Sequence, residues 1–330
     1  MKSVGVAILG FGTVGAGVAD CLTRRRGVIA SRAGVDVRLV RVADLDTETD
    51  RGVALPDGVL GADASAAIAD PAVDIVVETI GGTGVAKKFM LDAIAAGKSV
   101  VTANKKLLAE TGGELFDAAA AKGVDLYFGA AVGGRIPVIR AVRDALAANE
   151  FVSIAGILNG TCNYILTRME KDGLRFDDAL AEAQSHGFAE ADPTLDIDGF
   201  DTAHKICILA NLAFGRGTRL EDVEIKGIRG ISVEEVAAAA RAGGHVKLLG
   251  RAALGPDGRV EVTVRPERVP AGALLGCVEG VYNAVEIESE PAGKTVYVGK
   301  GAGRNPTAST VAADVCEIAR NIARGVVRNV

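Results

Sequence analysis

A glycine-rich turn near the N-terminus constrains the fold of this sequence more than any other feature. The apolar run of residues 4–9 is followed directly by Gly10-Phe11-Gly12-Thr13-Val14-Gly15, and the pattern of residues 16–25 predicts a helix. Strand, GxGxxG and helix in this order are typical of a dinucleotide-binding unit, whose pyrophosphate lies at the helix N-terminus. A glycine-rich turn in an ordinary α/β unit is the alternative.

Each glycine of this turn has a separate expected role. Gly10 would make the tight turn, and Gly12 would let the backbone approach a pyrophosphate. Gly15 would allow the helix to pack closely on the strand.

Strands and helices then alternate regularly along the first part of the chain, which predicts an α/β fold with a doubly wound parallel sheet. Ligands of such sheets bind at the carboxyl ends of the strands. The predicted strands are residues 35–43, 74–80, 99–102 and 124–128, and the predicted helices are residues 84–96 and 113–122.

Asp44 directly follows the predicted second strand. A loop is expected before that strand, over residues 27–34. An acidic side chain at this strand end would bond the ribose hydroxyls of NAD and repel the 2′-phosphate of NADP. The position therefore favours NAD, although Arg41 and Arg51 keep NADP open. Asp44 could also be a turn residue that ends the strand.

Two other predicted strand ends carry candidate residues. Thr79 lies in the glycine-rich stretch 78–82, which suits a segment running along a cofactor. Lys105 directly follows the strand of residues 99–102 and is expected to point over the cofactor crevice, whereas Lys106 is expected to be solvated.

A dense acidic stretch, residues 187–205, is the main candidate for an active site. Asp201 and Lys205 are spaced one helical turn apart, and the apolar residues that follow predict a helix packed inward. A calcium loop is excluded because Lys205 occupies the position of its bidentate Glu. A plain surface ion pair remains the alternative. The charged residues of the stretch are Glu190, Asp192, Asp196, Asp198, Asp201 and Lys205.

Length and composition limit the possibilities further. A chain of 330 residues predicts two domains. Its net charge of −5 argues against nucleic acid as a partner. Its five scattered cysteines, without a Cys-x-x-Cys pair, indicate a reduced cytoplasmic protein. No stretch approaches the length of a membrane span.

The second half of the chain predicts a different architecture. Period-two patterns at residues 246–249, 260–264, 285–287 and 295–298 predict a mixed or antiparallel sheet, and residues 306–324 predict a long final helix. We therefore expect a dinucleotide-binding domain of residues 1–130 plus 305–330. A substrate-binding and dimerisation domain would comprise residues 131–304.

Five motifs together resemble the homoserine dehydrogenase family, in the family's order and over nearly the whole chain. They are GFGTVG at residues 10–15, TANKK at 102–106, NGTCNYIL at 159–166, EADPTLDIDGFDTAHK at 190–205 and GAGRNPTAS at 301–309.

The resemblance implies NAD(P)-dependent interconversion of L-aspartate 4-semialdehyde and L-homoserine, in threonine, methionine and isoleucine biosynthesis. We expect a cytoplasmic homodimer. The resemblance also implies that Lys205 carries the proton, that Lys105 lies between cofactor and substrate, and that Glu190 and Asp201 hold homoserine. It places Phe11, Thr13, Val14, Gly187 and Gly303 against the nucleotide.

The family often binds a monovalent cation in a loop that corresponds to Gly129, Val132, Gly134 and Ile136. The usual Glu of that loop is Gly129 here, and Arg135 adds a positive charge. Any ligation would therefore come from backbone carbonyls.

Two functional alternatives and one expectation about architecture accompany this resemblance. The scaffold could serve another amino acid dehydrogenase, or a nucleotide sensor that needs neither Lys105 nor Lys205. The sequence ends soon after the last predicted helix, so we expect a short form without a regulatory ACT domain and without threonine inhibition through one.

Overall fold

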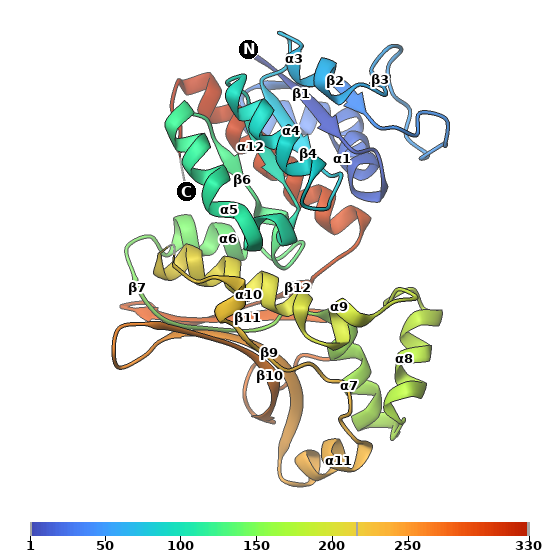
Figure 1. Ribbon diagram of the computed structural model, residues 1–330, viewed down its shortest axis with the longest axis vertical. Coiled ribbons are helices and arrows are strands. Elements are labelled where there is room, and N and C mark those ends of the chain that lie inside the picture. Colours follow the sequence, from blue (N-terminus) through green and yellow to red (C-terminus); the bar gives the residue numbers. More distant parts are fainter. Residues whose placement is uncertain (1, 216, 329–330) are drawn as a thin grey trace. The chain divides into compact units, whose positions relative to one another are not determined.

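The computed structural model describes residues 2–215 and 217–328, and the chain divides into two compact units (Figure 1). Unit 1 comprises the chain up to Gly134 together with the stretch from Gly303, and unit 2 comprises Arg135–Ala302. Among the described residues, no helix is both long and apolar enough to cross a bilayer.

Unit 1 contains a six-stranded parallel sheet in the order β3-β2-β1-β4-β5-β6. This confirms the predicted doubly wound sheet. The strand order reverses between β1 and β4, so a crevice for ligands is expected beyond the carboxyl ends of these two strands. The strands are β1 (Ser3–Leu9), β2 (Asp36–Ala43), β3 (Leu60–Gly61), β4 (Ile75–Glu78), β5 (Ser99–Thr102) and β6 (Leu126–Tyr127).

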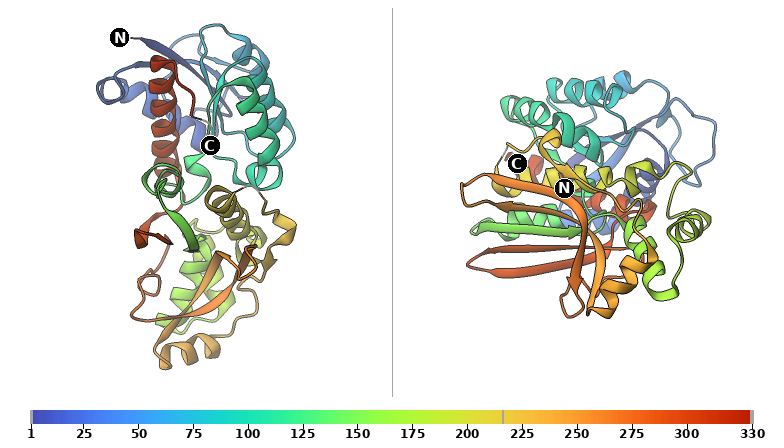
Figure 2. Two further views of the ribbon diagram at one scale, coloured as in Figure 1. Left: turned by 90° about the vertical axis from the view of Figure 1, so that its left-hand side faces the viewer. Right: turned by 60° about the horizontal axis from the view of Figure 1, so that its bottom comes forward.

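Helices cover both faces of this sheet. Figure 2 shows the final helix α12 on one side of the sheet and α4 and α5 on the other. Helix α12 packs against α1, so these two helices, far apart in the sequence, belong to one layer. The helices are α1 (Thr13–Arg24), α2 (Arg26–Ala33), α3 (Ala64–Ala69), α4 (Val85–Ala95), α5 (Lys105–Lys122), η1 (Gly129–Ala131) and α12 (Arg304–Arg324).

Two sequence-based predictions in unit 1 were wrong. The expected loop over residues 27–34 is helix α2, which ends at Gly34 with the left-handed conformation that glycine favours. Helix α5 begins at Lys105, not at residue 113, because the Asn104 side chain caps it. A kink at Thr111 interrupts α5 and hides its continuity in the sequence.

Unit 2 contains the second predicted sheet, in the order β12-β11-β7-β9-β10-β8. All its pairings are antiparallel except β10 with β8, so the sheet is mixed. The strands are β7 (Glu150–Ile157), β8 (Glu224–Ile225), β9 (Gly244–Leu254), β10 (Val260–Pro270), β11 (Tyr282–Glu290) and β12 (Gly293–Lys300).

Helix α10 lies directly on β9 of this sheet. A Cβ atom on Gly250 would lie 3.0 Å from Thr202 and 3.1 Å from Ile206, so the absence of a side chain there lets the helix approach. The helices of unit 2 are α6 (Val138–Arg140), η2 (Ala141–Ala145), α7 (Gly160–Asp172), α8 (Phe176–Ser185), α9 (Thr194–Ile197), α10 (Phe200–Phe214), η3 (Leu220–Asp222) and α11 (Val233–Arg241).

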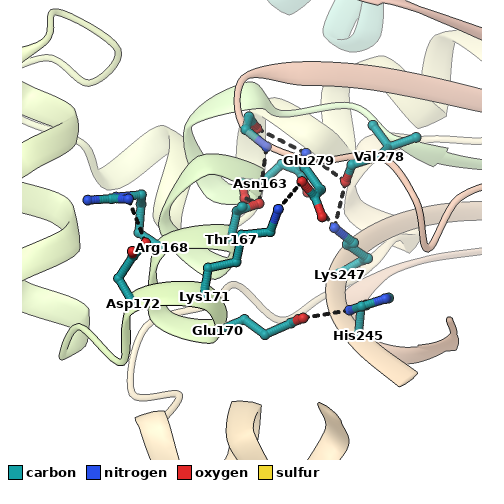
Figure 3. Close-up of polar contacts among 11 residues, drawn as sticks. Asn163, Thr167, Arg168, Glu170, Lys171, Asp172, His245, Lys247, Val278 and Glu279 are labelled. Carbon is teal, nitrogen blue, oxygen red and sulfur yellow. Dashed lines mark hydrogen bonds and ion pairs between the residues drawn. The ribbon is translucent and has the colours of Figure 1, made fainter. Parts of the chain in front are cut away.

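A buried lysine fixes the loop before β11. Figure 3 shows Lys247 of β9, which donates to the Val278 carbonyl at 2.6 Å and to Asn163 Oδ1 at 3.3 Å. Burial lowers the pKa of the Lys247 amine. Nearby, His245 contacts Glu170 at 2.7 Å, and Lys171 pairs with Glu279. These contacts tie the loop to α7 and β9, and we assign Lys247 a structural role.

Candidate active site

The turn after β1 has the geometry expected of a dinucleotide fingerprint. Gly10 has φ +93°, and a Cβ on Gly15 would lie 1.9 Å from the Gly10 carbonyl oxygen. Both positions therefore require glycine to form the turn and to pack α1 on the strand. Gly12 precedes α1 with nothing within 4 Å of its Cβ position, which leaves open space beside the helix N-terminus. Thr13 is exposed, and Val14 is partly buried.

Asp44 directly follows β2 and braces this turn. Its Oδ2 accepts from the backbone N–H of Phe11 at 2.5 Å, and its Oδ1 accepts from the N–H of Asp46 at 2.9 Å. The Phe11 side chain is 3% exposed and belongs to the core of unit 1. The Asp44 carboxylate thus lies beside the glycine-rich turn, and its oxygens keep lone pairs for further donors.

The two arginines that keep NADP open are both engaged by carboxylates. Arg41 pairs with Asp70 at 2.8 Å. Arg51 pairs with Asp46 at 2.7 Å and donates to the Phe11 carbonyl at 3.0 Å. Arg51 therefore lies against the turn, whereas Arg41 is directed to another part of unit 1.

A buried carboxylate organises the ends of β4 and β5. Glu78 is 0% exposed, and its Oε1 accepts from the N–H groups of Ile80 and Gly81, each at 2.9 Å. Its Oε2 accepts from the Thr102 hydroxyl at 2.5 Å. Sequence reasoning missed Glu78 as a positioning residue. An acidic side chain at the end of an apolar strand was the available signal.

Thr79 and Lys105 occupy these strand ends. The Thr79 hydroxyl donates to the Gly10 carbonyl at 2.7 Å, so it joins β4 to the glycine-rich turn. Lys105 is partly buried at the start of α5. The preceding Asn104 donates to the Gly82 carbonyl at 2.7 Å, which holds the two strand-end loops together.

In unit 2, helix α10 carries a buried ion pair. Lys205 Nζ contacts Asp201 Oδ2 at 2.6 Å and donates to the Leu158 carbonyl at 2.6 Å. The two residues are only 8% and 7% exposed, respectively. The predicted helical spacing is therefore present, and burial removes the alternative of a surface ion pair.

Two residues that sequence reasoning did not assign complete this network. Asn159 Nδ2 donates to Asp201 Oδ2 at 2.8 Å and to Asp196 Oδ1 at 2.7 Å, while its Oδ1 caps α7. In the sequence, Asn159 stands out only as the first residue of the NGTCNYIL motif, which does not show that its side chain reaches Asp196 and Asp201. Cys162 lies beside Asp196, and burial raises the pKa of its thiol well above the usual value.

The other acidic residues of the stretch separate from this pair. Asp198 pairs with Arg229 at 2.7 Å. Asp192 accepts from Thr194, and this hydrogen bonding lowers its pKa. Glu190 and Gly187 are exposed on the segment after α8, where Gln184 donates to the Glu190 carbonyl at 3.1 Å.

A carboxylate from another part of unit 1 lies against the predicted cation loop. The Gly129 N–H donates to Asp314 Oδ2 at 2.8 Å, and a Cβ on Gly129 would lie 2.8 Å from the same oxygen. Asp314, from α12, is 1% exposed. The Gly134 carbonyl accepts from Thr310 at 2.7 Å. Val132 is buried, and the Arg135 side chain is exposed. Ile136, the fourth residue of the predicted loop, belongs to unit 2.

Comparison with known families identifies both units. Residues 10–129 match the family model described as the NAD binding domain of homoserine dehydrogenase, and residues 137–316 match the model described as homoserine dehydrogenase. The chain belongs to the homoserine dehydrogenase family.

Individual homoserine dehydrogenases are similar over almost the whole chain. The enzyme of Neisseria gonorrhoeae is 45% identical over 97% of this chain and 73% of its own length. A structure from Thiobacillus denitrificans is 44% identical with a TM-score of 0.94, covering 98% of this chain and 75% of that one. A hyperthermophilic archaeal homoserine dehydrogenase in complex with NADPH is 27% identical with a TM-score of 0.81, covering 96% and 98%.

This membership establishes the chemistry. The chain is an NAD(P)-dependent oxidoreductase that interconverts L-aspartate 4-semialdehyde and L-homoserine, a reaction of amino-acid biosynthesis. The family membership therefore replaces the two functional alternatives, another amino acid dehydrogenase and a non-catalytic nucleotide sensor.

The open space at Gly12 gives a test of the cofactor site. We expect Gly12→Ala to change the free energy of unfolding by less than about 0.5 kcal/mol, because its Cβ meets no atom within 4 Å. Cofactor binding should weaken at least about tenfold, because the methyl group occupies the space of the pyrophosphate. Thermal unfolding and a fluorescence titration with reduced cofactor measure the two effects.

Gly15→Ala is the matched control, because its Cβ would lie 1.9 Å from the Gly10 carbonyl oxygen and should destabilise the fold. A Gly12→Ala protein that loses stability but keeps its affinity for cofactor would contradict this assignment.

Proposed function

We propose that Lys205 is the proton carrier of the reaction and that Asp201 orients it. The observation that carries this proposal is the buried pair with Nζ 2.6 Å from Asp201 Oδ2. An ammonium has three N–H groups, and within the described residues two of them have partners, Asp201 and the Leu158 carbonyl. The third N–H is the one we assign to the substrate oxygen.

A bound nicotinamide supplies the hydride when the aldehyde is reduced and accepts it when homoserine is oxidised. Reduction leaves negative charge on the former carbonyl oxygen, and Lys205 donates its proton there. In the reverse direction Lys205, as the neutral amine, takes the hydroxyl proton of homoserine and becomes the ammonium. Asp201 stabilises the ammonium, and Asn159 keeps the Asp201 carboxylate in place through its bond at 2.8 Å.

We propose that Glu190 and Asp201 recognise the ammonium of the amino acid. Two carboxylates suit a substrate cation because charge-assisted hydrogen bonds are stronger than neutral ones. Gln184 supports this role because it holds the Glu190 and Ala191 carbonyls and so fixes the exposed segment. Lys105, at the start of α5, is proposed to contact both cofactor and substrate.

For the cofactor we propose NAD in preference to NADP. The carboxylate of Asp44 beside the turn disfavours a 2′-phosphate, and the carboxylates of Asp46 and Asp70 already engage Arg51 and Arg41. The archaeal relative with NADPH shows that its own site accepts the phosphate. The proposed cofactor-binding residues are Gly10, Phe11, Gly12, Thr13, Val14, Gly15, Asp44, Thr79, Lys105, Gly187 and Gly303.

We further propose that the loop from Gly129 holds a monovalent cation through backbone carbonyls of Gly129, Val132, Gly134 and Ile136. The residues fit such an ion because the buried Asp314 carboxylate supplies negative charge beside Gly129. Initial rates in sodium chloride and in tetramethylammonium chloride at equal ionic strength test this. Equal rates would contradict a cation requirement.

For assembly we propose a cytoplasmic homodimer, with unit 1 binding the dinucleotide and unit 2 binding the substrate and the second copy. Tyr282 and Val298 support this, because they lie on one face of β11 and β12 and are 46% and 57% exposed. The net charge of −5 disfavours nucleic acid as a partner. Light scattering measures the mass in solution, and a monomer would contradict the proposal.

The proton carrier is tested by Lys205→Ala. We expect kcat for homoserine oxidation to fall at least about 10³-fold, with cofactor affinity changed less than about twofold, because the residue acts on the substrate oxygen. Lys247→Met is the matched control. It removes another buried lysine of unit 2, outside this network, and should retain turnover. A Lys205→Ala protein within tenfold of the wild-type kcat would refute the role.

Cofactor preference is tested by the kcat/KM values for NAD and NADP. The wild type should favour NAD, and Asp44→Asn should lower the NAD/NADP ratio about tenfold, because it removes the charge that repels the phosphate. Asp36→Asn, at the other end of β2, is the control and should leave the ratio unchanged. An unchanged ratio in Asp44→Asn would leave Asp44 as a turn residue only.

A further inference from the structure

Asn283 is one of three buried side chains of unit 2, with Thr202 and Ser289, whose polar atoms have no partner within the described residues, and it is the only amide of the three. Asn283 of β11 is 1% exposed, and neither its Oδ1 nor its Nδ2 has a hydrogen-bond partner within the described residues. Buried amides in native proteins are almost always satisfied, and each unsatisfied group costs about 1–3 kcal/mol. An exception therefore requires an explanation.

The other buried asparagines behave in the ordinary way. Asn163 Nδ2 donates to three carbonyls, at 3.2, 3.0 and 3.1 Å. Asn159 bonds two carboxylates and caps α7. Asn321 of unit 1 donates to Asp125 and Tyr127. Asn283 is thus the exception among chemically identical side chains of similar burial.

The Asn283 amide lies against the segment that follows β12. A Cβ on Gly301 would lie 2.3 Å from Cγ, 2.3 Å from Nδ2 and 2.4 Å from Oδ1 of Asn283. A Cβ on Gly160 would lie 3.4 Å from Asn283 Oδ1. Only glycine fits at position 301 while this amide is in place. The amide therefore touches the backbone of the segment without bonding to it.

The segment of residues 301–303 is short and rich in glycine. It connects β12 to α12 and contains two glycines, Gly301 and Gly303. Gly303 has φ +120° and ψ +154°, a combination accessible essentially to glycine alone. Gly301 and Ala302 each carry a backbone N–H and a backbone carbonyl, the two groups that an amide side chain needs, whereas the Gly303 carbonyl accepts from the Thr307 N–H at 3.0 Å.

We propose that Asn283 is a positioning residue that bonds the backbone of residues 301 and 302 when cofactor is bound. In the conformation described here its amide lies against Gly301 without a partner. Cofactor binding at Gly303 selects the conformation in which the amide gains its hydrogen bonds, so these bonds favour the bound state. This inference rests on the proposed contact of Gly303 with the cofactor.

The alternative is a purely structural role, in which Asn283 only fills space between two glycine-containing segments. An apolar side chain of similar volume would then serve equally well, in stability and in activity. The two explanations differ in one respect. A positioning residue leaves the stability of the protein without ligand unchanged or lowers it, and it strengthens cofactor binding. A spacer contributes equally to stability with and without ligand.

Asn283→Leu separates these explanations. We expect the melting temperature of the ligand-free protein to stay equal or rise, because two unsatisfied groups disappear. We expect the Kd for reduced cofactor to rise at least about tenfold, with a smaller thermal shift on saturation and a higher KM for cofactor. Ser289→Ala is the matched control. Ser289 lies on the same strand, is 0% exposed and also lacks a partner within the described residues, and its removal should leave cofactor binding unchanged.

Asn283→Ala keeps the test decisive if the larger Leu prevents folding, because it adds no volume. Gly301→Ala in the Asn283→Ala background has room for its methyl group, so folding should be retained while the weak cofactor binding persists. Wild-type affinity in a folded Asn283→Leu or Asn283→Ala protein overturns the inference. The wild type is titrated first. If it binds cofactor normally and Gly303→Val binds equally well, the proposed role of Gly303 fails instead.

Discussion

The buried ion pair between Asp201 and Lys205 joins helix α10 to the connection between β7 and α7, and the candidate site of unit 2 is built around it. Burying two charges costs several kcal/mol per ion unless further hydrogen bonds satisfy them. Here the Leu158 carbonyl and Asn159 provide those bonds. Both come from the end of β7 and the start of α7, and α10 reaches them because Gly250 lets it lie close to β9. Fold and site are therefore specified by the same contacts.

In unit 1, buried and half-buried carboxylates fix loops through the backbone. Glu78, Asp44 and Asp314 each accept hydrogen bonds from backbone N–H groups of loops beyond strand ends. A carboxylate can satisfy several such donors at once, so one side chain fixes a loop that has no regular structure. The glycine-rich turn keeps its shape in this way while leaving Gly12 open to a ligand. The bracing carboxylate Asp44 holds the turn through the Phe11 N–H, and the Cβ position of Gly12 still meets no atom within 4 Å.

The sequence was sufficient for features determined by local spacing. The alternation of strands and helices predicted the parallel sheet, GFGTVG predicted the glycine-rich turn, and the spacing of Asp201 and Lys205 predicted one helical face. Contacts between distant parts of the chain were not predictable. The pairing of Asp198 with Arg229 and the reach of Asn159 to Asp196 depend on how α9, α10 and β8 fold together. The same holds for Asp314 beside Gly129, since nothing near residue 129 indicates a partner on the last helix.

The local errors have a related cause. Helix α5 appeared to start late because Thr111 and two following glycines break its pattern, while Asn104 was read as part of a strand-end motif rather than as a cap. Asn283 is the extreme case, because a single Asn in a strand pattern carries no signal at all. Its significance lies in what its amide does not contact, and that is visible only once every neighbouring donor and acceptor is placed. A buried amide without partners is unfavourable in one conformation, and a second conformation that satisfies it would explain why such a side chain is kept.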